Sequence, residues 1–156
     1  MIATLNADEI ALGYFSAGYN CAQSVLLAVA EPLKLDGTDL AAISAPFGDG
    51  LAQEGRICGC LTASAMAIGL AVGRSGVRDA RSREMSYAAM KTILKWFTER
   101  LHATECNELT GIDFADREHL QENLAKVRLE ICGPIVSFVT QLAVAQIEVL
   151  RQRGGL

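Results

Sequence analysis

The stretch "RICGCLTASAMAIGLAVG" at residues 56–73 decides the fold. Beyond its first position it contains no charged residue, and small residues recur in it every four positions, at Gly59, Ala63, Ala67 and Ala71. Because residues four apart share one face of an α-helix, that face carries almost no side chain. Such a ridge lets a neighbouring helix approach at the short end of the usual interaxial spacing of about 8–10 Å. We therefore predict a central helix here, or a helix on a dimer seam.

The composition outside this stretch also favours helices. The chain has 156 residues, of which 51% are hydrophobic and 21% charged. That is a globular composition, and the length suffices for one domain with a sizeable core. There are three prolines, no strand-like alternation of Val, Ile and Thr, and many Ala, Leu, Glu and Gln residues. Residues of this kind have high helix propensity, so we expect an all-α protein.

Capping residues and apolar periodicity indicate where the helices lie. Asn6 is followed three residues later by Glu9, and Asn20 by Gln23, which is the spacing of a capping box. Breaks follow at Pro32, at Gly73 and at Gly133 with Pro134. We expect helices over residues 6–17, 20–31, 55–73, 79–101, 120–131 and 134–151, with shorter helical turns after Thr38 and Thr104.

The segment 79–101 has the clearest amphipathic pattern. Its predicted apolar face carries Met85, Ala89, Ile93, Trp96 and Phe97. Helices joined by loops this short usually become antiparallel neighbours. We therefore predict a single-domain antiparallel helical bundle of about five to seven helices spanning residues 1–156.

Charge and hydropathy limit the cellular setting. The formal net charge is −4 and the pI about 5.2, which argue against nucleic acid or an anionic membrane as partner. A secretory signal begins with basic residues, and the first ten residues of this sequence contain none. The uncharged run Ile57–Gly73 is shorter than the roughly 20 residues of a membrane span. We expect a soluble cytoplasmic protein, in which cysteines indicate metal binding or redox chemistry before structural disulfides.

Four of the five cysteines lie at or near predicted helix starts, and Cys60 lies just deeper in its helix. A helix start presents unpaired N–H groups and about half a positive charge, both of which stabilise a thiolate. Thiolate is the form that binds metals and exchanges disulfides. We therefore predict that the sulfurs converge in one pocket as redox-active or metal-ligating groups, namely Cys21, Cys58, Cys106 and Cys132, with Cys60 as a further ligand.

Packing is the alternative for each cysteine, since a free cysteine behaves as a small buried hydrophobe. It applies most to Cys60, which lies deeper in the central helix. In a regular helix Cys58 and Cys60 would point to nearly opposite sides, because successive residues turn by about 100°. They can share a ligand only if the first turn is irregular. The sequence contains no C-x-x-C, and no C-x-x-C-H for haem attachment.

Four segments carry a resemblance to a known family: "FSAGYNCAQSVL" (15–26), "FGDGLAQEGRICGCLTASAMAIGL" (47–70), "ECNELTGID" (105–113) and "ICGPIV" (131–136). They resemble the C-GCAxxG-C-C family of redox-active proteins, which is similar to the C-terminal part of split-Soret cytochromes. The resemblance implies an all-α fold, redox chemistry and a homodimer. Its cysteines correspond to Cys21, Cys58, Cys106 and Cys132, and its Gly-Cys pair to Gly59 and Cys60.

This chain departs from the family pattern at three positions. Leu61 stands in place of alanine, Ser64 in place of glycine, and Asp49 interrupts a glycine run. Asp49 could alter the loop facing the sulfurs. In that loop Gly48 and Gly50 would let backbone approach a cluster or substrate, or the loop is a plain connector. The loop lacks the Lys-Ser/Thr of a phosphate-binding loop, so no nucleotide is expected.

Three functional hypotheses follow. In the first, the cysteines ligate an iron–sulfur cluster or cycle between dithiol and disulfide during electron transfer with an unknown donor or acceptor. In the second, they hold a structural zinc ion. In the third, the protein is a packed helical homodimer with incidental thiols and no redox turnover. We favour redox chemistry, because the long intervals between the cysteines lack the paired short loops of zinc modules.

Overall fold

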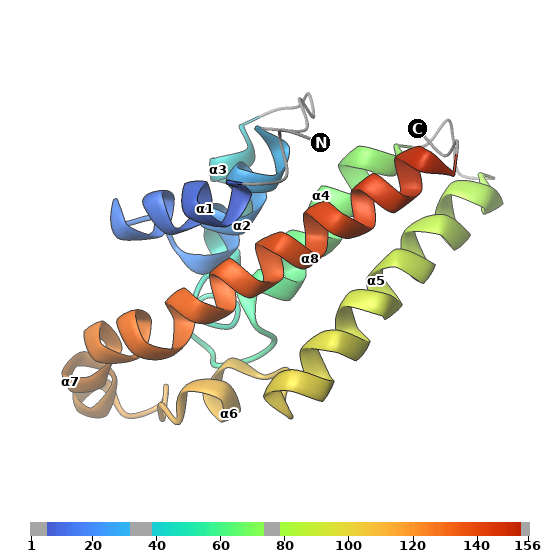
Figure 1. The fold of residues 1–156 in the computed structure, drawn as a ribbon. Helices are drawn as coiled ribbons and strands as arrows, with labels where there is room; N and C mark the ends of the chain where they lie inside the picture. The colour runs from blue at the N-terminus through green and yellow to red at the C-terminus, as the bar shows by residue number, and fades with distance from the viewer. Residues whose placement is uncertain (1–5, 32–38, 74–78, 154–156) are drawn as a thin grey trace.

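The computed structural model describes residues 6–31, 39–73 and 79–153 (Figure 1). Across these ranges there is no β-strand, so the all-α prediction is confirmed. The elements are α1 (Ala7–Ser16), α2 (Cys21–Ala30), α3 (Leu40–Ser44), the 3₁₀ turn η2 (Ala45–Phe47), α4 (Gly59–Val72), α5 (Ala80–Leu101), α6 (Cys106–Thr110), α7 (Arg117–Val127), the π-helical turn η3 (Arg128–Cys132) and α8 (Gly133–Gln152).

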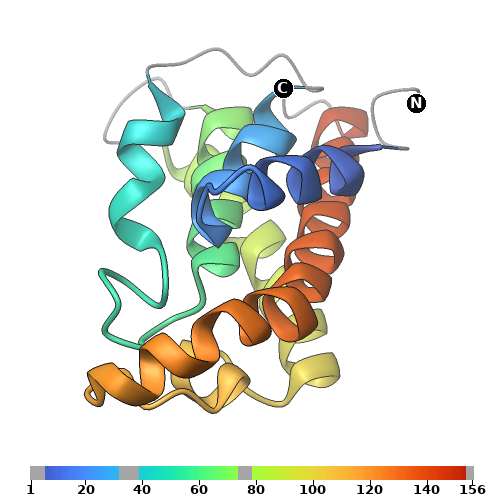
Figure 2. The same ribbon diagram turned by 90° about the vertical axis from the view of Figure 1, so that its left-hand side faces the viewer.

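Helix α4 is the central helix that the small-residue ridge predicts. It packs against α2, α5 and α8, which surround it in Figures 1 and 2. Its ridge is buried, with relative exposures from 0% at Ala63 and Ala67 to 9% at Ala71. Because the ridge has almost no side chains, three helices can pack closely around a single element. The start of α4 is therefore fixed from several sides.

Helix α5 corrects one prediction about the core. Ala89, Ile93 and Phe97 are buried, but Trp96 is 53% exposed. The three buried residues are four positions apart and form one narrow stripe. Trp96 lies about 100° away from Phe97 around the helix, so its ring faces largely into solvent.

The final helix also differs from the prediction. Gly133 and Pro134 do not interrupt it, and α7, η3 and α8 form one continuous helix, Arg117–Gln152. A proline ring clashes with the carbonyl four residues earlier and offers no N–H. The π turn absorbs this conflict, since the Gly133 N–H bonds to the carbonyl of Arg128, five residues back. Among the described residues this helix alone is long and apolar enough to cross a membrane, and half of its apolar window is buried inside the fold.

Candidate thiol site

Asn20 fixes the position of Cys21 at the start of α2. The Asn20 side chain accepts a hydrogen bond from the Gln23 N–H (2.9 Å), and the Gln23 side chain accepts one from the Asn20 N–H (3.0 Å). This is the capping box predicted from sequence, whereas the Asn6 side chain makes no such bond. Asn20 Nδ2 also donates to the carbonyl of Ala45 (2.8 Å), which ties the start of α2 to η2. Cys21 is the first residue of the capped helix and is 8% exposed.

The Cys-Gly-Cys segment begins α4 in an irregular way. Cys58 is the N-cap, with φ −55° and ψ 129°, so it lies outside the helix that starts at Gly59. The rotation that would separate Cys58 and Cys60 in a regular helix therefore does not apply. Gly59 lies directly against Cys21, since a Cβ built on Gly59 would come 2.7 Å from Cys21 Sγ. Only glycine lets the Cys21 sulfur lie over the backbone between the other two cysteines.

The Cys60 thiol interacts with two other thiols at this point. The Cys60 thiol hydrogen-bonds with Cys21 and with Cys58, and these bonds together with complete burial raise the pKa of Cys60 well above its usual value. The same bond from Cys60 lowers the pKa of Cys21, against the effect of burial. A donor thiol thus stabilises a neighbouring thiolate. Cys60, which the sequence favours as a packing residue, is the hydrogen-bond donor at the centre of the group.

A left-handed backbone turn supplies another donor. Five consecutive residues, Asp49–Gln53, have positive φ angles between 52° and 72°, and four of them are not glycine. The turn places the Asp49 N–H on the Cys21 sulfur, and the Ala22 N–H is a further donor; both lower the pKa of Cys21. The Asp49 carboxylate has the opposite effect on that pKa through its negative charge. Left-handed residues other than glycine cost about 1–2 kcal/mol each, so the turn is strained.

Hydrogen bonds and close contacts hold this turn in place. The Ala52 N–H donates to the Pro46 carbonyl (2.8 Å), and the Arg56 N–H to the Gly50 carbonyl (2.8 Å). A Cβ on Gly50 would come 2.6 Å from Cys106 Cβ and 2.6 Å from the Arg56 nitrogen. A Cβ built on Gly48 would come 2.5 Å from Asn20 Nδ2. Both glycines therefore allow the backbone of the loop to approach neighbouring residues of the fold closely.

Cys106 is joined to the start of α4 through the backbone. The Cys106 N–H donates to the Arg56 carbonyl (2.6 Å), and the Cys58 N–H to the Thr104 carbonyl (2.9 Å). These bonds flank an isolated antiparallel bridge between Ile57 and Glu105. Because residues 56–58 take part in this pairing, α4 begins later than the predicted Gly55 or Arg56. The loop before α4 reaches the end of the molecule that carries α6 and η3 in both ribbon views (Figures 1 and 2).

Burial opposes ionisation at the two remaining cysteines. Burial raises the pKa of Cys132 to about 12, and the negative charges of Cys21 and Cys58 add to the increase, while Arg128 opposes it. The pKa of Cys106 is also raised above its ordinary range, chiefly by burial and then by Cys58 and Cys21. The predicted thiolate stabilisation at every helix start is therefore wrong for these two. Cys132 lies in the continuous π turn and has no free helix end, and α6 has only five residues.

The arrangement brings all five predicted cysteines to one region, but not around one point. Cys60 interacts with Cys21 and with Cys58, and the charges of Cys21 and Cys58 act on both Cys106 and Cys132. Within the described residues, no three His, Cys, Asp or Glu side chains are placed to hold a metal ion. All five thiols are free. Sequence reasoning places Asp49 in the loop facing the sulfurs but does not predict that its N–H reaches Cys21, because consecutive left-handed conformations at non-glycine residues have no sequence signal.

Comparisons with known proteins agree with this cysteine pattern. A family model described as "Putative redox-active protein (C_GCAxxG_C_C)" matches residues 19–146. No curated protein and no solved structure matches the chain. The matched range includes all five cysteines, the left-handed turn and the central helix. The chain therefore belongs to the C_GCAxxG_C_C family of redox-active proteins.

Proposed function

We propose that this protein is a thiol-based redox protein in which Cys21 and Cys60 cycle between dithiol and disulfide. The observation that carries the proposal is the contact between these two sulfurs, in which Cys60 donates to Cys21 and lowers the pKa of Cys21. Thiolate is the attacking form in disulfide exchange. Cys21 is thus the nucleophile, and Cys60 is the protonated thiol held next to it.

The reaction balances with a disulfide-bearing partner as oxidant. The Cys21 thiolate attacks one sulfur of the partner disulfide, which forms a mixed disulfide and releases the first partner thiolate. Cys60 then loses its proton and attacks Cys21 Sγ, which forms the Cys21–Cys60 disulfide and releases the second partner thiol. Two electrons pass to the partner, which takes up two protons overall. In reverse, the reduced protein is regenerated by a dithiol.

The same geometry explains how Cys60 becomes reactive at the second step. The contact with Cys21 is the largest cause of the raised pKa of Cys60. Once Cys21 is part of a mixed disulfide, it no longer carries a negative charge that holds the Cys60 proton. The pKa of Cys60 therefore falls after the first step, when its thiolate is needed.

A chromogenic disulfide tests this sequence of steps. The reduced protein is mixed with one equivalent of 5,5′-dithiobis(2-nitrobenzoate) at pH 7. We expect release of two thionitrobenzoate ions per reagent molecule, and a protein that has lost two hydrogens and gained no adduct. Cys60→Ala should stop at the mixed disulfide with one ion released, whereas Cys106→Ala should behave as the unmodified protein. Release of one ion from the unmodified protein, with a stable adduct, would refute the exchange pair.

Ligation of an iron–sulfur cluster is the second candidate, because five thiols from four separate segments meet at one end of the fold. A cluster would take four thiolates from among Cys21, Cys58, Cys60, Cys106 and Cys132, and would supply one-electron chemistry. The arrangement described above does not place three of them around a common position. Ligation would therefore require these segments to shift, and no step through a cluster follows from the present geometry.

Anaerobic purification separates the two candidates and the zinc alternative. A brown protein with iron and acid-labile sulfide would favour the cluster. A colourless protein with one zinc, unfolded by a chelator, would favour a structural metal. A colourless, metal-free protein that passes the chromogenic test would favour the dithiol pair.

We also propose that the protein acts in the cytoplasm as a homodimer and exchanges electrons with a separate protein. The reduced state of cytoplasmic thiols fits a cycle that starts from the dithiol. Trp96 on α5 is 53% exposed, and a second copy that covered its ring would remove apolar surface from water. Light scattering of the unmodified protein and of Trp96→Ala tests this: the dimer should be lost in the variant, and a monomer in both would refute it.

A further inference from the structure

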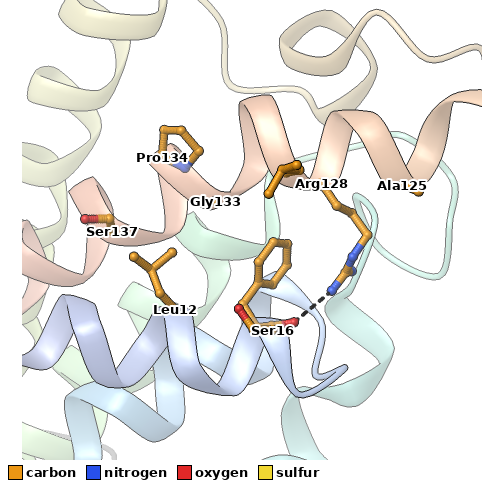
Figure 3. Close-up of a pocket in the computed structure, with 9 residues that line it drawn as sticks. Leu12, Ser16, Ala125, Arg128, Gly133, Pro134 and Ser137 are labelled. Carbon is orange, nitrogen blue, oxygen red and sulfur yellow. Dashed lines mark hydrogen bonds between the residues drawn. The ribbon is translucent and has the colours of Figure 1, made fainter.

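A groove separate from the buried sulfurs lies between α1 and the continuous helix α7–η3–α8 (Figure 3). Its volume is about 660 Å³, within the range of small-molecule sites. Most of the lining that the structure describes is apolar, and Arg128 is the one ionisable residue among these described lining residues.

Arg128 is held rigidly at one end of this groove. Its guanidinium carbon lies 4.1 Å from the centre of the Phe15 ring, in a cation–π contact. Its Nη2 donates to the carbonyls of Tyr19 (3.1 Å) and Phe15 (3.4 Å), and Figure 3 draws the second bond. Both carbonyls lie at or just beyond the end of α1. The orientation of the side chain is thus set before any ligand arrives.

In the described part of the chain, no carboxylate neutralises the charge of Arg128. Among the described residues no carboxylate lies within 4.0 Å of it, and no acceptor contacts its Nε or Nη1. A guanidinium presents its donors in a fork that matches a carboxylate or another oxyanion in two parallel hydrogen bonds. A preoriented cation with unused donors beside an apolar surface selects a ligand with both features.

We propose that this groove binds a small amphiphilic organic anion, with its apolar body against Leu12, Leu129 and Pro134 and its oxyanion on Arg128. This inference does not depend on the proposed thiol cycle. It places the ligand near one member of the cysteine group, since Cys132 ends the π turn that Arg128 begins and directly precedes Gly133 of the lining.

Decanoate is the probe for a direct test, with decan-1-ol as the uncharged control and decyltrimethylammonium as the cation. Isothermal titration should show that decanoate binds at least tenfold more tightly than decan-1-ol, with one site per chain. Arg128→Gln should remove this tenfold preference. Arg117→Gln on the same helix, outside the lining, should keep it.

A blocking variant keeps the test meaningful if Arg128→Gln unfolds. Ala125 is exposed at the groove, so Ala125→Trp fills the groove while leaving Arg128 in place. We expect it to abolish decanoate binding without lowering the melting temperature. The proposal is overturned if decanoate and decan-1-ol bind equally, or if Ala125→Trp still binds decanoate. Two further results would overturn the proposal. One is binding of phosphatidylglycerol vesicles without binding of free decanoate, which would indicate a lipid surface. The other is that Ala125→Trp dissociates a dimer in light scattering and leaves decanoate binding unchanged, which would indicate a second copy of the chain.

Discussion

The charge state of Cys21 is set by a few atoms around its sulfur. The Cys60 thiol and the N–H groups of Asp49 and Ala22 favour the thiolate, whereas burial and the Asp49 carboxylate favour the thiol. The net result is a lowered pKa for Cys21 in a site where burial alone would raise it. Because the donors come from three different segments, each can be removed separately.

Removing the Cys60 donor tests its share in this balance. In Cys60→Ala, Cys21 loses the hydrogen bond that most lowers its pKa, so iodoacetamide should alkylate Cys21 only at higher pH. Cys60→Ser keeps an O–H donor and should give a profile close to that of the unmodified protein. The rate of Cys21 alkylation is measured from pH 5 to 10 by peptide mass spectrometry. Superimposable profiles for the alanine variant and the unmodified protein would contradict the assigned donor.

The Asp49 side chain should have the opposite effect from its own backbone. Asp49→Asn removes the negative charge but keeps the N–H and tolerates a left-handed conformation. The pKa of Cys21 should therefore fall, and its alkylation should begin at lower pH. Asp39→Asn, at the cap of α3, is the control. A shift of the Asp49→Asn profile toward higher pH would show that the variant loses the turn.

Helix α4 depends on the absence of a side chain at one position. Gly59→Ala places a Cβ 2.7 Å from Cys21 Sγ and 2.8 Å from the Phe47 carbonyl oxygen, so we expect it to lower the free energy of unfolding by about 1–3 kcal/mol. Gly69 is in the same helix with no atom within 4 Å of its added Cβ. Gly69→Ala should raise the free energy of unfolding by about 0.5–1 kcal/mol. Urea denaturation of both variants checks the contrast, and equal effects would contradict the close packing at Gly59.

The left-handed turn can be relaxed by a single substitution. Ala52 has φ +52° and is exposed, so Ala52→Gly should raise the free energy of unfolding by about 0.5–1 kcal/mol as strain is relieved. Ala65→Gly, exposed on the right-handed α4, should lower it by a similar amount. Thermal denaturation of both variants gives the signs. A destabilised Ala52→Gly would show that the turn is not strained.

Sequence patterns predict the regular elements well and the irregular ones poorly. The four-residue spacing from Gly59 to Ala71 identifies the central helix, and Asn20 with Gln23 identifies the start of α2, because both depend on local periodicity or local hydrogen bonds. The left-handed turn and the π turn depend on partners distant in sequence. Arg56 and Cys106 hold the first, and the clash at Pro134 produces the second, so neither has a local signal.

At the scale of the whole molecule, the buried thiols make stability depend on pH. The pKa of Cys132 is raised to about 12 in the folded state, against about 8.5 in an unfolded chain. Its contribution to stability is complete below pH 8.5 and is lost as the pH rises toward 12, because only the unfolded thiol ionises there. The pKa of Cys106 is shifted in the same direction.

The predicted result is a fall in the free energy of unfolding above pH 8.5. Between pH 8 and pH 10, the free energy of unfolding of Cys132→Ala should fall by about 1–2 kcal/mol less than that of the unmodified protein. Urea denaturation of the reduced proteins at several pH values across this range gives the slope of the free energy of unfolding against pH. The difference between the two slopes does not depend on the constant cost of the substitution itself. Parallel slopes would contradict the buried, neutral state of Cys132.

The gathering of the cysteines follows only partly from the sequence. Their placement near predicted helix starts indicates one shared region, and the structure brings them there. The sequence does not indicate which sulfurs touch, because that depends on Gly59 lying against Cys21 and on the non-helical backbone of Cys58. Nor does it reveal the groove at Arg128, since Phe15 and Tyr19 lie more than a hundred residues away along the chain.

The most direct test of a redox pair is to find which sulfurs join at equilibrium. The anaerobic protein is equilibrated with graded ratios of reduced and oxidised dithiothreitol, alkylated, and mapped by tandem mass spectrometry. We predict a single two-electron transition that produces a Cys21–Cys60 disulfide while Cys106 and Cys132 remain alkylated. If Cys21 stays a free thiol at every potential, or if the first bond forms between Cys106 and Cys132, the proposed pair is wrong.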